Sequence, residues 1–522
     1  MIEVIKRYKW FLIGLFAFAL FIRAAIFVGY LGKNQNFWQV DSNTYHLIAE
    51  QISQGHGICT DPGHPNFYRL PGYSLFLSAF YKIFGPDTKN VLWLQIFMAA
   101  LIPLLIFLLG CILFPQNILI AKTAGIYGSI HIGYVLYSGF FMAESLFIFL
   151  FLIFAILFLS SVHLFFCFQN RCNCKESDKI FRYFSLPDPI ATSEPYLSLF
   201  EDMFENEQKN VVLCNCQETE LIKSSRNLLG AGFALGLASL VRPVGHYLIC
   251  LSILILIFSN ETCRQKISKS FTLFCGWIVP VIFWLARNFI LTGHIFFHTL
   301  PGGHFLYFSA SRVAMHECHC SYDQAKDILR KKVDEIVTQE EQIKHKKLSE
   351  IEQCDIRENL AKQYFKKYPA LSIKLWLTDI FRTATSLYSA ELLYIESGRK
   401  EIDYFNAKRT IKSMVYKYLV PQTEKSWLRW LIRLEILVFF LMILGLFLGF
   451  LRTVFRCIKN WDSEINRINL CSWLRSLAFA TFFIVIGLAG GYARMRLPAE
   501  VFLIILSMSF WVPMLTEFKN KS

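Results

Sequence analysis

Residues 145 to 168 read Ser145-Leu-Phe-Ile-Phe-Leu-Phe-Leu-Ile-Phe-Ala-Ile-Leu-Phe-Leu-Ser160-Ser-Val-His-Leu-Phe-Phe-Cys-Phe168, without a single Asp, Glu, Lys or Arg. A helix needs about twenty apolar residues to cross the hydrocarbon core of a bilayer. The stretch therefore predicts a membrane-spanning helix. The composition agrees, because 54% of the chain is hydrophobic and only 18% is charged. We expect an all-α polytopic membrane protein.

Similar apolar runs recur along the chain. Seven more are long enough to span: Trp10–Leu31, Val91–Phe114, Ile118–Ser138, Phe271–Leu291, Trp427–Leu451, Trp473–Tyr492 and Leu497–Leu515. Two shorter runs, Leu228–Val241 and Gly245–Phe258, flank Arg242-Pro243. We interpret them as two spans that meet at a tight turn on the outer face. The sequence thus predicts about ten transmembrane helices.

Basic residues set the expected orientation, since short cytoplasmic loops are enriched in Lys and Arg. Lys6, Arg7 and Lys9 precede the first span, so the N-terminus is expected in the cytoplasm. No small-residue cleavage site follows, which favours a retained anchor. The net charge of +14 fits this bias and an attraction to anionic membrane lipids. No nucleic-acid-binding motif accompanies the charge, so no nucleic-acid partner is expected.

The predicted topology divides the chain into alternating membrane and soluble parts. Residues 71–85 are too short to span comfortably, and we expect a juxtamembrane helix in the outer interface there. The five predicted parts are an N-terminal transmembrane module at 1–168 with a first outer loop at 32–90, a cytoplasmic insertion at 169–226, transmembrane helices at 227–291, a mainly helical outer insertion at 292–426, and C-terminal transmembrane helices at 427–522.

Cysteines mark both insertions. Four of them make a weak candidate for a zinc site in the cytoplasmic insertion: Cys172, Cys174, Cys214 and Cys216. Structural zinc sites usually separate paired cysteines by two residues or more, whereas these pairs are separated by one. Free thiols are the favoured interpretation, and a disulfide is disfavoured in a reducing compartment.

The outer insertion has its own cluster at His316-Glu-Cys318-His-Cys320, which we interpret as coincidence rather than as a metal site. Cys318, Cys320 and Cys354 are expected to form a disulfide if their compartment is oxidising.

The first outer loop carries the residues best suited to chemistry. Asp41 and Tyr45 are four positions apart and would share one face of a helix. A carboxylate at headgroup level can take a proton from an attacking hydroxyl. Arg69, within Tyr68-Arg69-Leu-Pro-Gly, offers a bidentate fork for phosphate oxygens. The alternative interpretation of Asp41 is a plain helix N-cap.

Three further charged residues are expected on the same face. Glu144 precedes the span quoted above, and its alternative role is a carboxylate favoured by the helix dipole. Arg494 and Arg496 lie between the last two spans. The alternative for these arginines is snorkelling to lipid headgroups.

The ordered set of motifs resembles bacterial members of glycosyltransferase family 39, in the GT-C superfamily that includes protein O-mannosyltransferases. The similarity covers most of the chain outside the two insertions. It rests on these elements: Asp41-x3-Tyr45, Gly55-x-Gly57, Tyr68-Arg69-x-Pro-Gly-Tyr73, Glu144-Ser145, Gly232-x3-Gly236 followed by Arg242-Pro243, Trp284-x2-Arg287-Asn288, and Arg494-x-Arg496-x-Pro498.

The resemblance implies roles for these residues. The implied catalytic residues are Asp41, which matches the first-loop acid that serves as general base or orients the acceptor, and Glu144, which matches a second acidic position. The implied substrate-binding residues are Tyr45, Tyr68, Arg69, Arg494 and Arg496. The family donor is a polyprenyl-phosphate sugar, and no soluble cofactor is required, while a role for a divalent metal is left open. The resemblance predicts no particular oligomeric state.

We therefore expect an inverting glycosyltransferase of the bacterial inner membrane that acts at its outer face on a glycan, lipid or protein acceptor. One alternative is a lipid or solute transporter or flippase without transferase activity. Transporters favour repeated halves and broken helices at the midplane. A second alternative is a membrane subunit that keeps the fold without activity.

Overall fold

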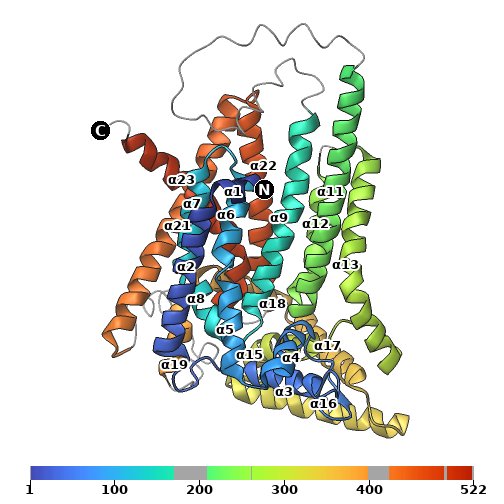
Figure 1. Ribbon diagram of the computed structural model, residues 1–522. Coiled ribbons are helices and arrows are strands. Elements are labelled where there is room, and N and C mark those ends of the chain that lie inside the picture. The colour runs from blue at the N-terminus through green and yellow to red at the C-terminus, as the bar shows by residue number, and fades with distance from the viewer. Residues whose placement is uncertain (1, 170–207, 260, 398–422, 487–490, 520–522) are drawn as a thin grey trace, which may run out of the picture.

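The computed structural model describes residues 2–169, 208–259, 261–397, 423–486 and 491–519. These residues form a bundle of long helices with shorter helices gathered at one end (Figure 1). The helices of the bundle are α1 (Ile2–Arg7), α2 (Lys9–Ile26), which continues as a π-helical turn at Phe27–Leu31, α5 (Thr88–Ala99), α6 (Ile102–Leu113), α7 (Ile118–Ile130), α8 (Ile132–Gly139), α9 (Glu144–Gln169), α11 (Gln208–Val241), α12 (Val244–Ile257), α13 (Cys263–Thr292), α21 (Ser426–Lys459), α22 (Glu464–Ile486) and α23 (Ala493–Lys519).

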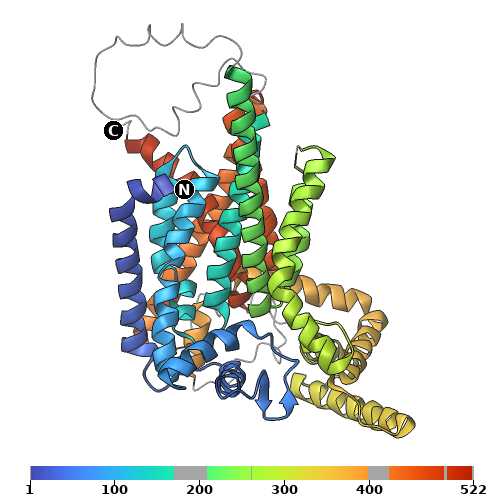
Figure 2. The same cartoon turned by 45° about the vertical axis from the view of Figure 1, so that its right-hand side comes forward.

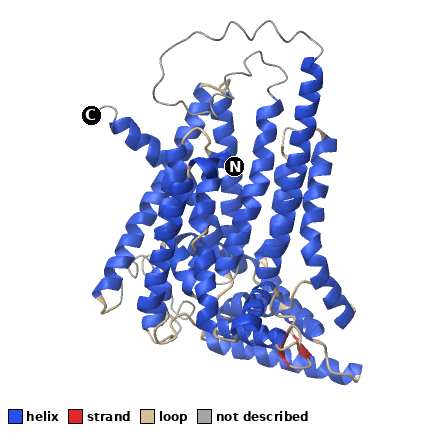
Figure 3. Ribbon diagram, in the orientation of Figure 1, coloured by secondary structure: helices blue, strands red, loops and turns tan. Residues whose placement is uncertain are grey.

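The first loop and the second insertion supply the shorter elements. The loop contains α3 (Ser42–Ser53), α4 (Gly72–Phe84) and an antiparallel hairpin of β1 (Cys59–Asp61) and β2 (His64–Pro65). Figure 3 shows this hairpin as the small strand pair in an otherwise helical molecule. The insertion contains α14 (Leu300–His304), a π-helical turn at Phe305–Ala310, α15 (Ser311–Cys318), α16 (Tyr322–Lys344), α17 (Glu350–Lys367), α18 (Pro369–Thr385) and α19 (Ser389–Glu396).

The chain is an all-α polytopic membrane protein. Within the described residues, seven helical stretches are long and apolar enough to cross a membrane: Lys9–Leu31, Thr88–Leu113, Glu144–Val162, Cys263–Thr292, Ser426–Lys459, Ile465–Ile486 and Ala493–Phe518. Helices α7 and α8 make an eighth if they count as one span bent by 47°. This number is lower than the ten expected, because α12 has only 14 residues and α11 does not meet the same test. The tight turn expected at Arg242-Pro243 does separate α11 from α12.

Exposed apolar side chains cover the outside of the bundle. Helix α2 exposes Trp10 and Phe21, α13 exposes Phe283, and α21 exposes Phe440 and Phe447. A soluble protein rarely leaves so much contiguous apolar surface open to water. These faces fit contact with lipid chains.

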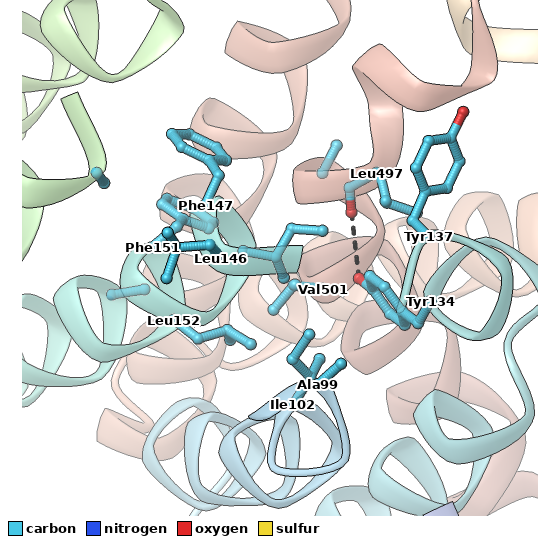
Figure 4. Packing of buried hydrophobic residues seen from close by; sticks show 14 of the residues in the cluster. Ala99, Ile102, Tyr134, Tyr137, Leu146, Phe147, Phe151, Leu152, Leu497 and Val501 are labelled. Atoms are coloured by element: carbon cyan, nitrogen blue, oxygen red, sulfur yellow. Dashed lines mark hydrogen bonds between the residues drawn. The ribbon is translucent and has the colours of Figure 1, made fainter. Parts of the chain in front are cut away.

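The bundle interior is packed with aromatic and aliphatic residues. Phe147 and Phe151 of α9 meet Val501 of α23 in the cluster shown in Figure 4. There the hydroxyl of Tyr134 donates to the carbonyl of Leu497 over 3.2 Å. This hydrogen bond joins α8 to the N-terminal part of α23.

Close backbone contact joins α11 to α13. A Cβ added at Gly232 would lie 2.1 Å from the carbonyl of Leu273, and one added at Gly276 would lie 2.2 Å from that of Leu229. Small residues allow such approach between membrane helices. Helices α11 and α13 therefore form a tightly packed pair.

The first loop and the second insertion share the end of the bundle opposite α1 (Figures 1 and 2). They also touch, because Thr299 N–H donates to the carbonyl of Phe67. Arg287, at the end of α13, donates to the carbonyls of Asn66 and Ile58. The guanidinium thereby ties the hairpin region to the bundle.

Candidate functional site

Three parts of the chain meet at Asp41. The Nη2 of Arg69 lies 2.5 Å from Asp41 Oδ1, and Nη1 of Arg494 lies 3.5 Å from Asp41 Oδ2. Asp41 immediately precedes α3, Arg69 precedes α4, and Arg494 is in the first turn of α23. Asp41 occupies the N-cap position of α3 but makes no side-chain capping bond. Its carboxylate is therefore committed to the arginines rather than to the helix end.

The guanidinium of Arg69 lies close to two tyrosine rings. Its guanidinium carbon lies 5.2 Å from the ring centre of Tyr45 and 5.1 Å from that of Tyr68. Cation–π contacts of this kind restrict a flexible side chain. Tyr45 is buried on the face of α3 that follows Asp41, as the four-residue spacing requires. Tyr68 is exposed.

Glu144 forms a second ion pair beside the first. Its Oε1 lies 3.6 Å from Nη1 of Arg242, and its side chain is only 4% exposed. The Nη2 of Arg242 lies 3.4 Å from the sulfur of Met495, the residue that follows Arg494. The charges of Glu144 and Arg242 reach Tyr45 as well. Both ion pairs therefore contribute to the electrostatic surroundings of Tyr45.

The electrostatics favour a charged Asp41. Burial raises the pKa of this carboxyl, but Arg494 and Arg69 offset that effect and hold the pKa below its usual value. For Tyr45, burial dominates and raises the pKa of the phenol. At neutral pH the site thus presents a carboxylate whose negative charge is already balanced by two cations.

Several buried polar atoms of the site make no hydrogen bond to any described residue. They are Nε of Arg69, Nε of Arg494 and Oε2 of Glu144. Leaving such atoms unpaired costs free energy. Two of the three atoms are guanidinium N–H donors, the kind of group that binds phosphate oxygens.

Sequence reasoning missed two groups of this site. Glu391 of α19 accepts a 2.8 Å hydrogen bond from the hydroxyl of Tyr137. Burial raises the pKa of Glu391, whereas the charge of Arg494 lowers it. His304, the last residue of α14, is close enough to respond to Asp41, Arg69 and Arg494. Both come from the second insertion, whose sequence carries no spacing that predicts contact with the first loop.

Arg496 lies apart from the Asp41 group. Its Nε donates to Glu500 over 2.6 Å, and its Nη1 donates to the carbonyls of Thr383 and Ala384. The side chain is 2% exposed. The structure thus uses Arg496 to hold α23 against the end of α18.

A glycine positions the loop that carries Arg69. A Cβ on Gly72 would lie 2.7 Å from the carbonyl oxygen of Leu240 and 2.8 Å from a methyl group of Val241. Only glycine allows α4 to begin this close to the end of α11. The approach brings Arg69 toward the turn that holds Arg242.

The cysteine predictions have separate outcomes. Cys172 and Cys174 lie outside the described residues, as do the side chains of Cys214 and Cys216, so the zinc candidate stays a prediction. The disulfide expected among Cys318, Cys320 and Cys354 is not formed, because all three are free thiols. Cys354 is buried and donates instead to the carbonyl of Thr299. Within the described residues, no three His, Cys, Asp or Glu side chains are placed to hold a metal ion.

Comparisons with known proteins give little beyond this geometry. No protein-family model matches the chain. No curated protein matches it either. Among solved structures, it is similar to the archaeal oligosaccharyltransferase AglB from Archaeoglobus fulgidus, in complex with an inhibitory peptide and a dolichol-phosphate. The similarity covers 99% of this chain at 13% identity and a TM-score of 0.47. The chain spans about half of that structure's length, 52%.

Proposed function

We propose that this protein is a membrane glycosyltransferase. It moves a sugar from a polyprenyl-phosphate-linked donor to a hydroxyl of a glycan, lipid or protein at the outer face of the bacterial inner membrane. The observation that carries the proposal is the placement of Asp41 between Arg69 and Arg494 at one end of a membrane bundle. A base and two phosphate-binding cations are thus already in contact.

The donor phosphate would compete with Asp41 for the two guanidinium groups. Arg binds phosphate through paired N–H donors, and its charge stabilises the negative charge that grows on a leaving phosphate. The unpaired Nε atoms of Arg69 and Arg494 supply further donors. As the arginines turn to the phosphate, Asp41 loses its balancing cations and becomes a better base.

The transfer step then follows from these positions. The acceptor oxygen attacks the anomeric carbon and forms the new C–O bond, while the bond from that carbon to the phosphate oxygen breaks. The electron pair of the broken bond stays on the phosphate, which the arginines neutralise. The acceptor proton passes to Asp41. Attack opposite the leaving group inverts the anomeric centre.

Glu144 and Glu391 complete the proposed site with a positioning role. The negative charge of each acts on the guanidinium of Arg494. Glu144 also pairs with Arg242, which the turn between α11 and α12 fixes in place. Two carboxylates beside one guanidinium limit the directions in which Arg494 can turn.

The test is transfer in proteoliposomes that contain purified protein, a panel of radiolabelled polyprenyl-phosphate sugars and candidate acceptors. We expect labelled product with wild-type protein and a large loss with Arg69→Ala. Arg330→Ala is the matched control, because Arg330 forms an exposed ion pair with Asp327. Vectorial movement of the labelled lipid without product would instead favour the flippase alternative.

A further inference from the structure

Three histidines lie between α12 and the Asp41 site: His246 of α12, His298, and His304 at the end of α14. The ring of His246 stacks on Phe297 with a centroid distance of 3.7 Å, and it is nearly parallel to the ring of His298 at 6.0 Å. His298 responds in turn to the charge of His304. His304 responds to the charges of Arg494, Arg69 and Asp41. His298 lies just before the five-residue helix α14 and His304 ends it, so α14 connects the residue beside α12 to the residue nearest the Asp41 group.

Three of the six ring nitrogens in this row are buried without a partner among the described residues. Both nitrogens of His246 and Nδ1 of His298 are buried and make no hydrogen bond to any described residue. The residue His246 is only 8% exposed. Buried polar atoms without partners cost free energy, and native proteins usually satisfy them with protein, water or ligand. Three such nitrogens in adjacent stacked rings point to a polar molecule that the row receives.

The two imidazoles outside the membrane helices are neutral at physiological pH. Burial, followed by the charge of His304, lowers the pKa of His298 to about 4. Burial, followed by the charges of Arg494 and Arg69, lowers the pKa of His304 to about 4. A neutral imidazole has one donor and one acceptor nitrogen. It therefore suits groups that both donate and accept, as hydroxyls do, rather than phosphate, which needs donors and positive charge.

We propose that His246, His298 and His304 form the subsite that holds the sugar of the donor. The inference rests on the proposed function, since the sugar must lie next to the phosphate bound by Arg69 and Arg494. The imidazoles hydrogen-bond the sugar hydroxyls. Phe297, which is only partly buried and belongs to the segment beside α12, provides an apolar surface for the C–H groups of the sugar ring. Entry of the sugar requires the 293–299 segment to shift from α12, because the ring nitrogens are covered in this structure.

Two lipids distinguish sugar binding from phosphate binding. We would measure the affinity of purified protein for bare undecaprenyl phosphate and for a panel of undecaprenyl-phosphate hexoses and pentoses. Wild-type protein should bind at least one sugar-bearing lipid more tightly than the bare lipid. The variants His246→Ala and His298→Ala should reduce that preference about tenfold each, which corresponds to about 1.4 kcal/mol. They should leave the affinity for bare lipid phosphate unchanged.

The controls separate a lost contact from a lost fold. His298→Gln keeps a neutral donor and acceptor, so it should retain part of the preference. His294→Ala changes an exposed histidine of the same loop and should have no effect. An unchanged preference in folded His246→Ala and His298→Ala protein would overturn the sugar subsite, as would equal wild-type affinity for all the lipids. Failure of wild-type protein to bind even the bare lipid phosphate would refute the proposed function itself.

Discussion

Arg69 donates a 2.5 Å hydrogen bond to Asp41, and the two residues are 28 positions apart in the first loop. The bond joins the proposed base to a proposed phosphate ligand before any substrate is bound. Breaking a partly buried ion pair is costly unless another anion replaces the carboxylate. In the proposed mechanism, donor binding would therefore release the base.

The arginine pair should control donor affinity. Arg69→Ala removes a charged donor set from the phosphate, and we expect the donor KM to rise by roughly ten- to hundredfold. Arg69→Lys should recover only part of the loss, because an ammonium group lacks the planar fork. Initial transfer rates at varied donor concentration measure both. A donor KM that stays at the wild-type value in Arg69→Ala would contradict a phosphate role.

The acid limb of the pH profile should move when donor binds. In the free protein, burial raises the pKa of Asp41 but the two arginines hold it below its usual value, so Asp41 stays ionised well into acid. Donor phosphate takes those cations and adds negative charge, both of which raise the pKa. Since kcat/KM reports the free protein and kcat the complex, the acid limb of kcat should lie at higher pH.

His304 also titrates in acid, because its pKa is lowered to about 4. The difference between the two limbs should therefore persist in His304→Gln if Asp41 causes it. Coincident limbs for kcat and kcat/KM in that variant would show that donor does not free Asp41.

Arg496 should behave as a structural residue. Its guanidinium is paired with Glu500 in the protein interior, and removing one partner leaves a buried charge. Arg496→Ala should destabilise the protein by about 3–5 kcal/mol. Thermal unfolding in detergent measures the loss, and the folded fraction should keep a donor KM close to wild type. A selective rise in donor KM without loss of stability would place Arg496 in the binding site.

Gly72 should be intolerant of any side chain. Gly72→Ala places a methyl group against the Leu240 carbonyl, so we expect destabilisation of about 1–3 kcal/mol and a misplaced Arg69. Gly29→Ala is the matched control, because nothing lies within 4 Å of a Cβ at that position. Melting temperatures of the two variants make the comparison. Equal melting temperatures would mean that α4 can move away from α11 at no cost.

Hydrophobic run length predicted most of the membrane architecture. The eight longest runs correspond to the seven long apolar stretches and the bent pair α7–α8. The bend itself was not predictable from hydropathy, because the run from Ile118 to Ser138 is mostly apolar and its one Lys, Lys122, lies far from the bend. It occurs at His131, whose backbone leaves the helical region and whose ring nitrogen accepts from Tyr134 N–H. Such a local capping interaction has no periodic signature.

The site was only partly predictable for a related reason. Topology and motif order pointed to Asp41, Arg69 and Arg494, and the structure brings these three together. The Arg494-x-Arg496 spacing also suggested that both arginines act alike. Residues two apart on a helix do not face each other, so only one can point at Asp41. His304 and Glu391 reach the site through tertiary contacts of the second insertion, and no local sequence pattern encodes such contacts.

The most direct test of the central claim compares Asp41→Asn with wild-type protein in two assays on the same reconstituted sample. The substitution removes the base but also frees Arg69 and Arg494 for phosphate. Transfer should therefore fall by at least about a hundredfold, while affinity for undecaprenyl phosphate should be unchanged or tighter. Transfer at the wild-type rate by Asp41→Asn protein, or a clear loss of affinity for the lipid phosphate, would contradict the account.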